Sequence, residues 1–225
     1  MSHLQGLSRR DFTVASAALA GGIAFGSYGN AEPAATTANG NPLAAGLGPN
    51  SVTFNPWVEI SPEKITLIAQ HADLGQGVGS VQPIMIAEEM DLDPGQFEIR
   101  FAGPSPAYFN TGFADESTSF LAADQSPAAQ AAHAAALESL RKSGLQQTGG
   151  SSAVPDTYEK LRVAGAVARE TLKAAAAKRS GVPAADIRTQ SGHVILPDGK
   201  RSLCRASHFP SIFAAAAWIA VRMRG

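Results

Sequence analysis

Residues 71–80 read HADLGQGVGS, and this stretch decides the fold. It follows the run Ile65–Ala69, whose β-branched and aliphatic residues are typical of a buried strand. It precedes Val81–Met90, where Pro83 lies near the first turn of an expected short helix. The sequence therefore predicts a strand, a glycine-rich turn and a helix in direct succession.

The glycine-rich turn has two interpretations. Gly75, Gly77 and Gly79 allow positive φ and a close backbone approach, and amides at the helix start would face an anion such as a phosphate. A tight turn that lets the helix pack on the strand explains the same residues. Neither the dinucleotide fingerprint nor a Walker A loop is present, because Ser80 replaces the third glycine and no Gly-Lys-Ser/Thr follows. The local sequence leaves both interpretations open.

Length and composition indicate a globular protein. The chain has 225 residues, enough for one or two domains with a proper core, and 44% of them are hydrophobic. The net charge of −1 provides no field that would attract nucleic acid or an anionic membrane, so no nucleic-acid partner is expected. Cys204 is the single cysteine and the five histidines are scattered, which excludes an internal disulfide and predicts no metal site made by side chains.

The N-terminus has the pattern of an export signal. Residues 8–12, SRRDF, form a twin-arginine motif, and a mild apolar run over residues 13–25 follows. Gly29 and Ala31 fit a cleavage site after Ala31, and the run is shorter than the roughly 20 residues that span a bilayer. We expect a twin-arginine signal over residues 1–31 and a periplasmic protein, with the leader either cleaved or kept as a membrane tether. An ordinary amphipathic or disordered N-terminus is the alternative.

The rest of the chain divides into three parts. Residues 32–53 are rich in Ala, Gly, Asn, Pro and Thr and are expected to form a flexible linker. Residues 54–203 carry strand and helix patterns, which predicts an α+β fold with a small mixed sheet and packed helices, and residues 204–225 form a divergent tail. The predicted strands are residues 55–60, 65–72, 97–101 and 192–196, the predicted helices are residues 81–90, 126–144 and 155–180, and residues 102–113 are predicted to be loop.

Two of these helices carry boundary or packing signals. Residues 126–144 are alanine-rich, with Ser126 as N-cap and Gly144 as the stop. This helix is expected to pack on the core, although a protruding helical insert would show the same alanine face. The helix at 155–180 carries an apolar stripe in which Gly165 leaves room for close backbone packing.

A second glycine turn, TGGSS at residues 148–152, precedes the helix at 155–180. Its hydroxyl groups, its amides and the helix dipole favour an anion. Neither turn contains Lys or Arg, so two neutral cradles suit a large phosphate-bearing ligand, and the amide of Gln76 could bond to its rings. An N-cap turn with a spare serine is the alternative. The candidate binding residues are Gly75, Gln76, Gly77, Thr148, Gly149, Gly150, Ser151 and Ser152.

An ordered series of motifs resembles a known family. The series consists of SRRDF at 8–12, NPW at 55–57, LGQGV at 74–78, AEEMD at 87–91, TGGSS at 148–152 and LRVAGA at 161–166. In this order the motifs resemble the N-terminal region of the molybdopterin-binding large subunit of the xanthine dehydrogenase and aldehyde oxidase family. The closest branch is that of the isoquinoline 1-oxidoreductase-like β subunits. The resemblance covers residues 55–202 and the leader.

The resemblance implies a cofactor and partners. By it, Gly75–Gly77 and Thr148–Ser152 match family segments that contact molybdopterin cytosine dinucleotide. Family members oxidise or hydroxylate aldehydes and N-heterocycles with oxygen from water. They pass electrons to a small subunit with [2Fe-2S] clusters, and a cytochrome is a further candidate acceptor. The metal and its dithiolene perform the difficult step, while the protein positions the cofactor and a small-molecule substrate.

The sequence also departs from the family. The family chain is considerably longer, and its catalytic carboxylate lies near the C-terminus of the full-length subunit. No position here matches that carboxylate, so no catalytic residue is assigned. The match fades after Leu203, from which we hypothesise a truncated or frameshifted product that is inactive alone.

Two other features invite a functional role and receive none. The acidic residues at a predicted helix end and turn could form a general-base pair, but a solvated face explains them better. They are Glu88, Glu89, Asp91 and Asp93. A lone histidine on a strand, His71, is expected to be merely packed or exposed.

Three functional hypotheses follow. The chain is part of an oxidoreductase subunit that carries a portion of a molybdenum cofactor site, or a non-catalytic secreted module whose loops bind another phosphate compound, or a non-functional remnant. The first requires the two glycine turns to converge. Gln76 and Gly150 on opposite sides of the molecule would refute it.

Overall fold

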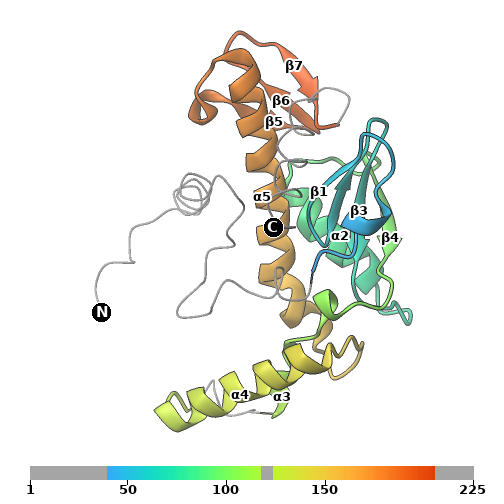
Figure 1. The fold of residues 1–225 in the computed structure, drawn as a ribbon, viewed down its shortest axis with the longest axis vertical. Coiled ribbons are helices and arrows are strands. Elements are labelled where there is room, and N and C mark those ends of the chain that lie inside the picture. Colours follow the sequence, from blue (N-terminus) through green and yellow to red (C-terminus); the bar gives the residue numbers. More distant parts are fainter. Residues whose placement is uncertain (1–39, 118–123, 206–225) are drawn as a thin grey trace.

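The strand, turn and helix predicted around residues 71–80 form the centre of the fold. A computed structural model describes residues 40–117 and 124–205 (Figure 1). In it, β3 (Ile65–Ala69) is buried along its whole length and pairs in parallel with β4 (Phe97–Phe101), and α2 (Val78–Glu89) connects the two strands. The predicted strand at 97–101 is confirmed, and the strand predicted at 65–72 is confirmed over 65–69 but ends three residues earlier.

Helix α2 starts earlier than the sequence predicted. It begins at Val78 rather than Val81, because Gly77 turns the chain with φ +83° and acts as N-cap. Pro83 therefore lies inside the helix and not near its first turn. Its missing amide removes only the bond to the carbonyl four residues earlier, at Gly79.

The larger sheet has the order β1-β2-β3-β4, with β1 (Val52–Asn55) and β2 (Val58–Ile60) antiparallel to their neighbours. The prediction of one strand over residues 55–60 is wrong. The chain reverses at Pro56 and Trp57, since the Asn55 side chain accepts a hydrogen bond from the Trp57 amide (2.9 Å) and proline cannot donate to a ladder. Before β1, within the predicted linker, the short 3₁₀ turn η1 (Ala44–Gly46) follows the buried Leu43.

The long helix α5 (Ala153–Ser180) packs against α2 and against β1 and β2. It starts two residues before the predicted position and ends at Gly181, whose φ is +74°. A Cβ on Gly165 would lie 2.5 Å from the Ile86 carbonyl oxygen. The predicted close packing at Gly165 is confirmed, and the main core lies between these two helices and the sheet.

A second sheet stands at the C-terminal end of α5 (Figure 1). It is an antiparallel meander of β5 (Arg188–Gln190), β6 (His193–Ile195) and β7 (Arg201–Leu203), preceded by the 3₁₀ turn η3 (Ala184–Asp186). The sequence predicted only the middle strand. Cys204 follows this sheet and is buried, whereas residues 206–225 of the predicted tail and the predicted signal at 1–31 lie outside the described residues.

Helix α4 (Pro127–Ser143) projects from the N-terminal end of α5 (Figure 1). Its caps are as predicted, because Ser126 Oγ accepts from the Ala129 amide (3.2 Å) and Gly144 has φ +63°. The expected packing on the core is wrong, since no residue of α4 is fully buried and its neighbours are α3 and η2. Those two elements, α3 (Gly112–Ser117) and η2 (Pro106–Tyr108), fall partly or wholly in the predicted loop at 102–113.

The structure is α+β, as predicted. Within the described residues, no helix combines the length and apolar character needed to cross a membrane.

Candidate functional site

Helices α2 and α5 run parallel, so their amino ends lie at the same end of the molecule. Near those ends Gln82 Nε2 donates to Thr157 Oγ1 (3.4 Å), and farther along the Arg169 guanidinium donates to the Glu89 carbonyl (2.7 Å). Residue numbers thus rise together along the contact. The turns that precede the helices, loop 1 (residues 71–77) and loop 2 (residues 147–152), are brought to one place.

The two loops meet at one carbonyl group. Thr148 Oγ1 of loop 2 donates to the Ala72 oxygen of loop 1 (3.1 Å), and Gln76 Nε2 donates to the same oxygen (3.3 Å). Just outside the loops, Gln146 Nε2 donates to the Gln70 carbonyl (2.9 Å). The structure therefore places the predicted site residues of the two turns side by side, while their binding of a ligand stays a prediction.

The amides of loop 1 are used by the protein itself. The Asp73 carboxylate accepts hydrogen bonds from the amides of Gly75 (2.8 Å), Gly77 (3.2 Å) and Gly79 (2.9 Å). These bonds lower the pKa of Asp73 below its ordinary value, the bond from Gly79 most of all. The cradle that the sequence predicted for an external anion is filled by an internal carboxylate.

Gln76 is engaged within loop 1 as well. Its Oε1 accepts from the Leu74 amide (2.6 Å), and its Nε2 donates to the Ala72 carbonyl. Both bonds are at the surface, so exchange with a ligand or with water costs little desolvation. Gln76 can reach a ligand only by giving up a bond that now shapes the loop.

Loop 2 keeps free donors. Gly150 and Ser151 both have positive φ (56° and 55°), which turns the chain sharply before α5. Within the described part of the chain, the amides of Gly149, Gly150 and Ser151 have no protein acceptor. Ser152 at the N-cap forms no side-chain cap bond, so its hydroxyl occupies none of the amides in the first turn of α5.

Ser152 and Asn110 brace loop 2 from below. Ser152 Oγ donates to the Gly149 carbonyl (2.7 Å) and accepts from Asn110 Nδ2 (2.8 Å), which also donates to the Gln147 carbonyl (2.9 Å). Gly112 permits this approach, because a Cβ there would lie 2.8 Å from that of Ser152. Of the five predicted residues of loop 2, Ser152 is therefore a structural member rather than an accessible one.

A buried carboxylate, that of Asp156, lies beneath both loops. Its Oδ1 accepts from the Thr111 amide and hydroxyl (2.6 Å each) and from Lys160, and its Oδ2 accepts from Gln70 Nε2 (2.6 Å). Lys160 also donates to the Phe109 carbonyl (3.0 Å). Burial lowers the pKa of Lys160, and the adjacent Asp156 carboxylate opposes that shift.

His71 is a neutral member of this cluster. Its backbone amide donates to Gln82 Oε1 (3.2 Å), which fixes Gln82 so that Nε2 faces His71 Nδ1 at 2.7 Å. Nδ1 is therefore the acceptor and the ring proton resides on Nε2. Burial lowers the pKa of His71, more than the neighbouring Asp156 raises it. Of the two expected states of His71, packed or exposed, the structure shows the packed one, and the ring lies inside a polar cluster.

Sequence reasoning missed Asp156 and Lys160, which look like an ordinary exposed i,i+4 pair. One signal could have found them. Thr157 lies four residues before Leu161 and therefore on the same face of α5 as the apolar stripe. A polar residue at this buried position indicates that the stripe ends in a polar cluster near the amino end of the helix. The long-range partners Thr111 and Gln70 carry no such signal.

The acidic residues at the end of α2 have structural partners. The Arg162 guanidinium donates to Glu89 Oε1 (2.7 Å), and Thr189 donates to Asp91 Oδ2 (2.5 Å). Two of the four residues predicted to form a solvated face thus hold α5 and β5 in place. Across residues 40–117 and 124–205, no group of three or more His, Cys, Asp or Glu could hold a metal ion.

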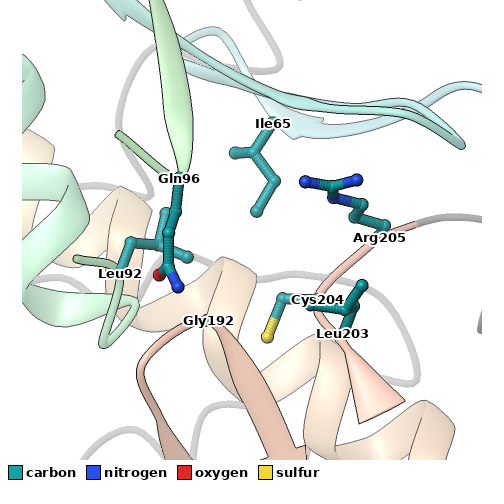
Figure 2. Close-up of a pocket in the computed structure, with 7 residues that line it drawn as sticks. All are labelled: Ile65, Leu92, Gln96, Gly192, Leu203, Cys204 and Arg205. Carbon is teal, nitrogen blue, oxygen red and sulfur yellow. The ribbon is translucent and has the colours of Figure 1, made fainter. Parts of the chain in front are cut away.

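The cavity in Figure 2 lies at the opposite end of β3 from the loops. It has a volume of about 40 Å³, room for water rather than for a dinucleotide. The Gln96 amide on its wall already donates to the Ser191 carbonyl (2.9 Å). It is lined by Ile65, Leu92, Gln96, Gly192, Leu203, Cys204 and Arg205.

Comparison with known proteins finds a relative of this chain, whereas no protein-family profile matches it. The chain is 30% identical over 197 residues to the isoquinoline 1-oxidoreductase subunit beta of Brevundimonas diminuta. The match covers 87% of this chain and 21% of that protein. The chain thus spans about a fifth of the length of the curated relative it matches. This similarity supports a distant relationship to an oxidoreductase subunit and, in part, the resemblance drawn from the motifs.

Proposed function

We propose that the chain is part of an oxidoreductase subunit and that loop 2, together with loop 1, binds a phosphate-bearing molybdopterin cofactor such as molybdopterin cytosine dinucleotide. One observation carries the proposal. The two loops meet at the Ala72 carbonyl, at the amino ends of two parallel helices. Helix amino ends and exposed amides are favourable surroundings for phosphate groups.

The residues of loop 2 fit a phosphate group. The free amides of Gly149, Gly150 and Ser151 can donate to its oxygens, and the dipole of α5 adds a partial positive charge. Loop 1 fits in a different way, because the amides of Gly75 and Gly77 are held by Asp73. Its backbone would form one rigid edge of the binding site, and the Gln76 side-chain amide would rotate to hydrogen-bond a heterocycle of the ligand.

Such a cofactor would supply the redox chemistry for hydroxylating an aldehyde or an N-heterocycle. The residues of this chain would bind and orient it and shield its phosphate groups from solvent. No catalytic base is proposed within the chain. By the same proposal its partners are a [2Fe-2S] small subunit and a cytochrome electron acceptor, and the twin-arginine leader directs it to the periplasm.

The test measures cofactor in the exported chain. We expect molybdenum, by elemental analysis, and CMP, released by acid hydrolysis, each at about one per chain. Gly150→Ala places a side chain at φ 56° in loop 2 and should lower both severalfold, whereas Gly199→Ala imposes the same strain at φ 82° in a turn beyond β6 and should lower neither. A folded wild-type chain that contains neither molybdenum nor CMP would overturn the proposal.

The neutral amides of loop 2 also favour a second candidate, a non-catalytic module that binds another phosphate compound. The same preparation separates the two. A folded chain without molybdenum that binds CMP or pyrophosphate in calorimetry, with the binding abolished by Gly150→Ala, supports the second candidate. A chain that does not fold at all supports neither.

A further inference from the structure

Asp156 connects polypeptide segments that are far apart in the sequence. It lies in the first turn of α5, four residues after the end of loop 2, and its side chain is inaccessible to solvent. Its Oδ2 holds Gln70 of the segment that leads into loop 1, and its Oδ1 holds Thr111. One carboxylate therefore joins the start of loop 1 to the end of loop 2.

Thr111 extends this connection to the body of loop 2. The preceding residue, Asn110, donates through its side chain to the Gln147 carbonyl and to Ser152 Oγ, and its own amide donates to the Leu145 carbonyl (2.7 Å). Displacement of Thr111 from Asp156 would carry Asn110 with it. Through Thr111 and Asn110, the positions of Gln147 and Ser152, at the two ends of loop 2, both depend on the hydrogen bonds to Asp156 Oδ1.

The negative charge of Asp156 is balanced by Lys160 and not by His71. Lys160 is the cation that neutralises Asp156, because His71 is locked as the neutral Nε2–H tautomer by Gln82. His71 Nε2 lies 3.6 Å from Asp156 Oδ2, too far for a good hydrogen bond. It is the one buried side-chain nitrogen or oxygen of the described residues that has no hydrogen-bond partner.

The buried Asp156–Lys160 pair and the unpaired His71 N–H do not increase the stability of the fold over that of apolar packing. A buried ion pair is often no better than apolar packing, and an unpaired imidazole N–H loses its hydration without compensation. Such costs are tolerated where the polar groups fix a particular geometry. Here the geometry that they fix is the distance between loop 1 and loop 2.

We infer that Asp156 is a positioning residue of the candidate site, which holds loop 1 and loop 2 in the relative arrangement that the ligand requires. The inference rests on the proposed function. Asp156 itself does not touch the ligand, since its carboxylate is enclosed by protein groups. It acts through Gln70 on the start of loop 1 and through Thr111 and Asn110 on loop 2.

The chain offers a matched pair of substitutions to test this. Thr111→Val removes the hydroxyl that donates to Asp156, and Thr189→Val removes the hydroxyl that donates to Asp91 at the far end of α5. Both remove one hydroxyl–carboxylate bond without changing side-chain shape. We expect similar, small falls in melting temperature for the two variants. A difference between them in ligand binding or loop exchange then shows the effect of where the lost bond lies.

Ligand binding and amide exchange supply the position-dependent readouts. Calorimetry with CMP should give a dissociation constant about threefold to tenfold weaker for Thr111→Val and unchanged for Thr189→Val. Hydrogen exchange should accelerate in peptides from residues 70–79 and 146–153 of Thr111→Val and stay unchanged there in Thr189→Val. Asp156→Asn should show the same two changes more strongly, and where it does not fold, Thr111→Val decides.

The outcomes separate the inference from the proposed function. Wild-type protein that contains no cofactor and binds no CMP overturns the proposed function, and the inference with it. Wild-type protein that binds CMP, with equal affinity and equal loop exchange in Thr111→Val and Thr189→Val, overturns the inference and leaves the proposed function standing.

Discussion

Among single residues, Asp73 decides what loop 1 can bind. Its carboxylate occupies the amides that an external phosphate would use, so the loop is preformed but already filled. This differs from a phosphate-binding glycine loop, in which the nest of amides awaits its ligand. The main role of Gly75 and Gly77 is to allow the positive φ angles of the turn.

The first prediction concerns the titration of Asp73. Its pKa is lower in the folded chain than in the unfolded chain, so the carboxylate contributes stability above about pH 4 and loses that contribution as the pH falls through the folded pKa. The amide proton shifts of Gly75, Gly77 and Gly79 should titrate together, with one midpoint below the ordinary value for Asp. In Asp73→Asn the common titration should vanish. Independent midpoints in the wild type would contradict this assignment.

The second prediction concerns Lys160. Lys160→Met leaves the Asp156 carboxylate buried without its counter-charge, which should lower the free energy of unfolding by about 3 kcal/mol. Lys142→Met breaks an i,i+4 pair with Glu138 on exposed α4 and should cost less than about 0.5 kcal/mol. Urea denaturation measures both. Equal effects would show that the Asp156 pair is no more important than a surface pair.

Among the helices, the contact between α2 and α5 depends on the missing side chain of Gly165. Alanine would favour the helix by about 1 kcal/mol, yet its Cβ would sit 2.5 Å from the Ile86 carbonyl oxygen and force the helices apart. That oxygen belongs to backbone and cannot rotate away.

The third prediction follows from this contact. Gly165→Ala should lower the free energy of unfolding by about 1–2 kcal/mol, since the overpacking exceeds the gain in helix propensity. Ala174→Ser on the exposed side of the same helix should change it by about 0.5 kcal/mol or less. Thermal unfolding followed by circular dichroism compares them. A higher melting temperature for Gly165→Ala would show that the helices can separate without cost.

The elements that the sequence predicted well are those with a strong local signal. Ile65–Ala69 is a continuous run of β-branched and aliphatic residues, and α4 has both a serine cap and a glycine stop. The elements it missed or merged, β1 with β2, β5 and β7, are three or four residues long, too short for a period to be visible. They form because a neighbouring strand supplies their hydrogen bonds.

The candidate site was predictable only in part, for a related reason. The two glycine turns and the helices that follow them are local features, and they do lie together. The roles of Asp156 and Asn110 depend on which groups the fold brings together, and residues 42 to 86 positions apart make these contacts. No pattern along the chain encodes such distances.

For the whole molecule, the fourth prediction concerns export. By the proposed function, replacing both Arg9 and Arg10 with lysine should retain the chain in the cytoplasm, because the arginine pair is the signal that the twin-arginine route reads. Fractionation and immunoblotting of cells that produce the two forms measure this. Equal amounts in the periplasm would remove the export proposal and leave the site proposal untouched.

Helix α5 has a mechanical consequence for the molecule as a whole. Its 28 residues make a rod about 42 Å long, with loop 2 at one tip and the β5–β7 sheet at the other. Near the middle, the missing side chain of Gly165 allows the backbone of α5 to approach the Ile86 carbonyl of α2 closely. One continuous helix therefore sets the separation between loop 2 and the small sheet, which lie at opposite ends of the core that the helix covers.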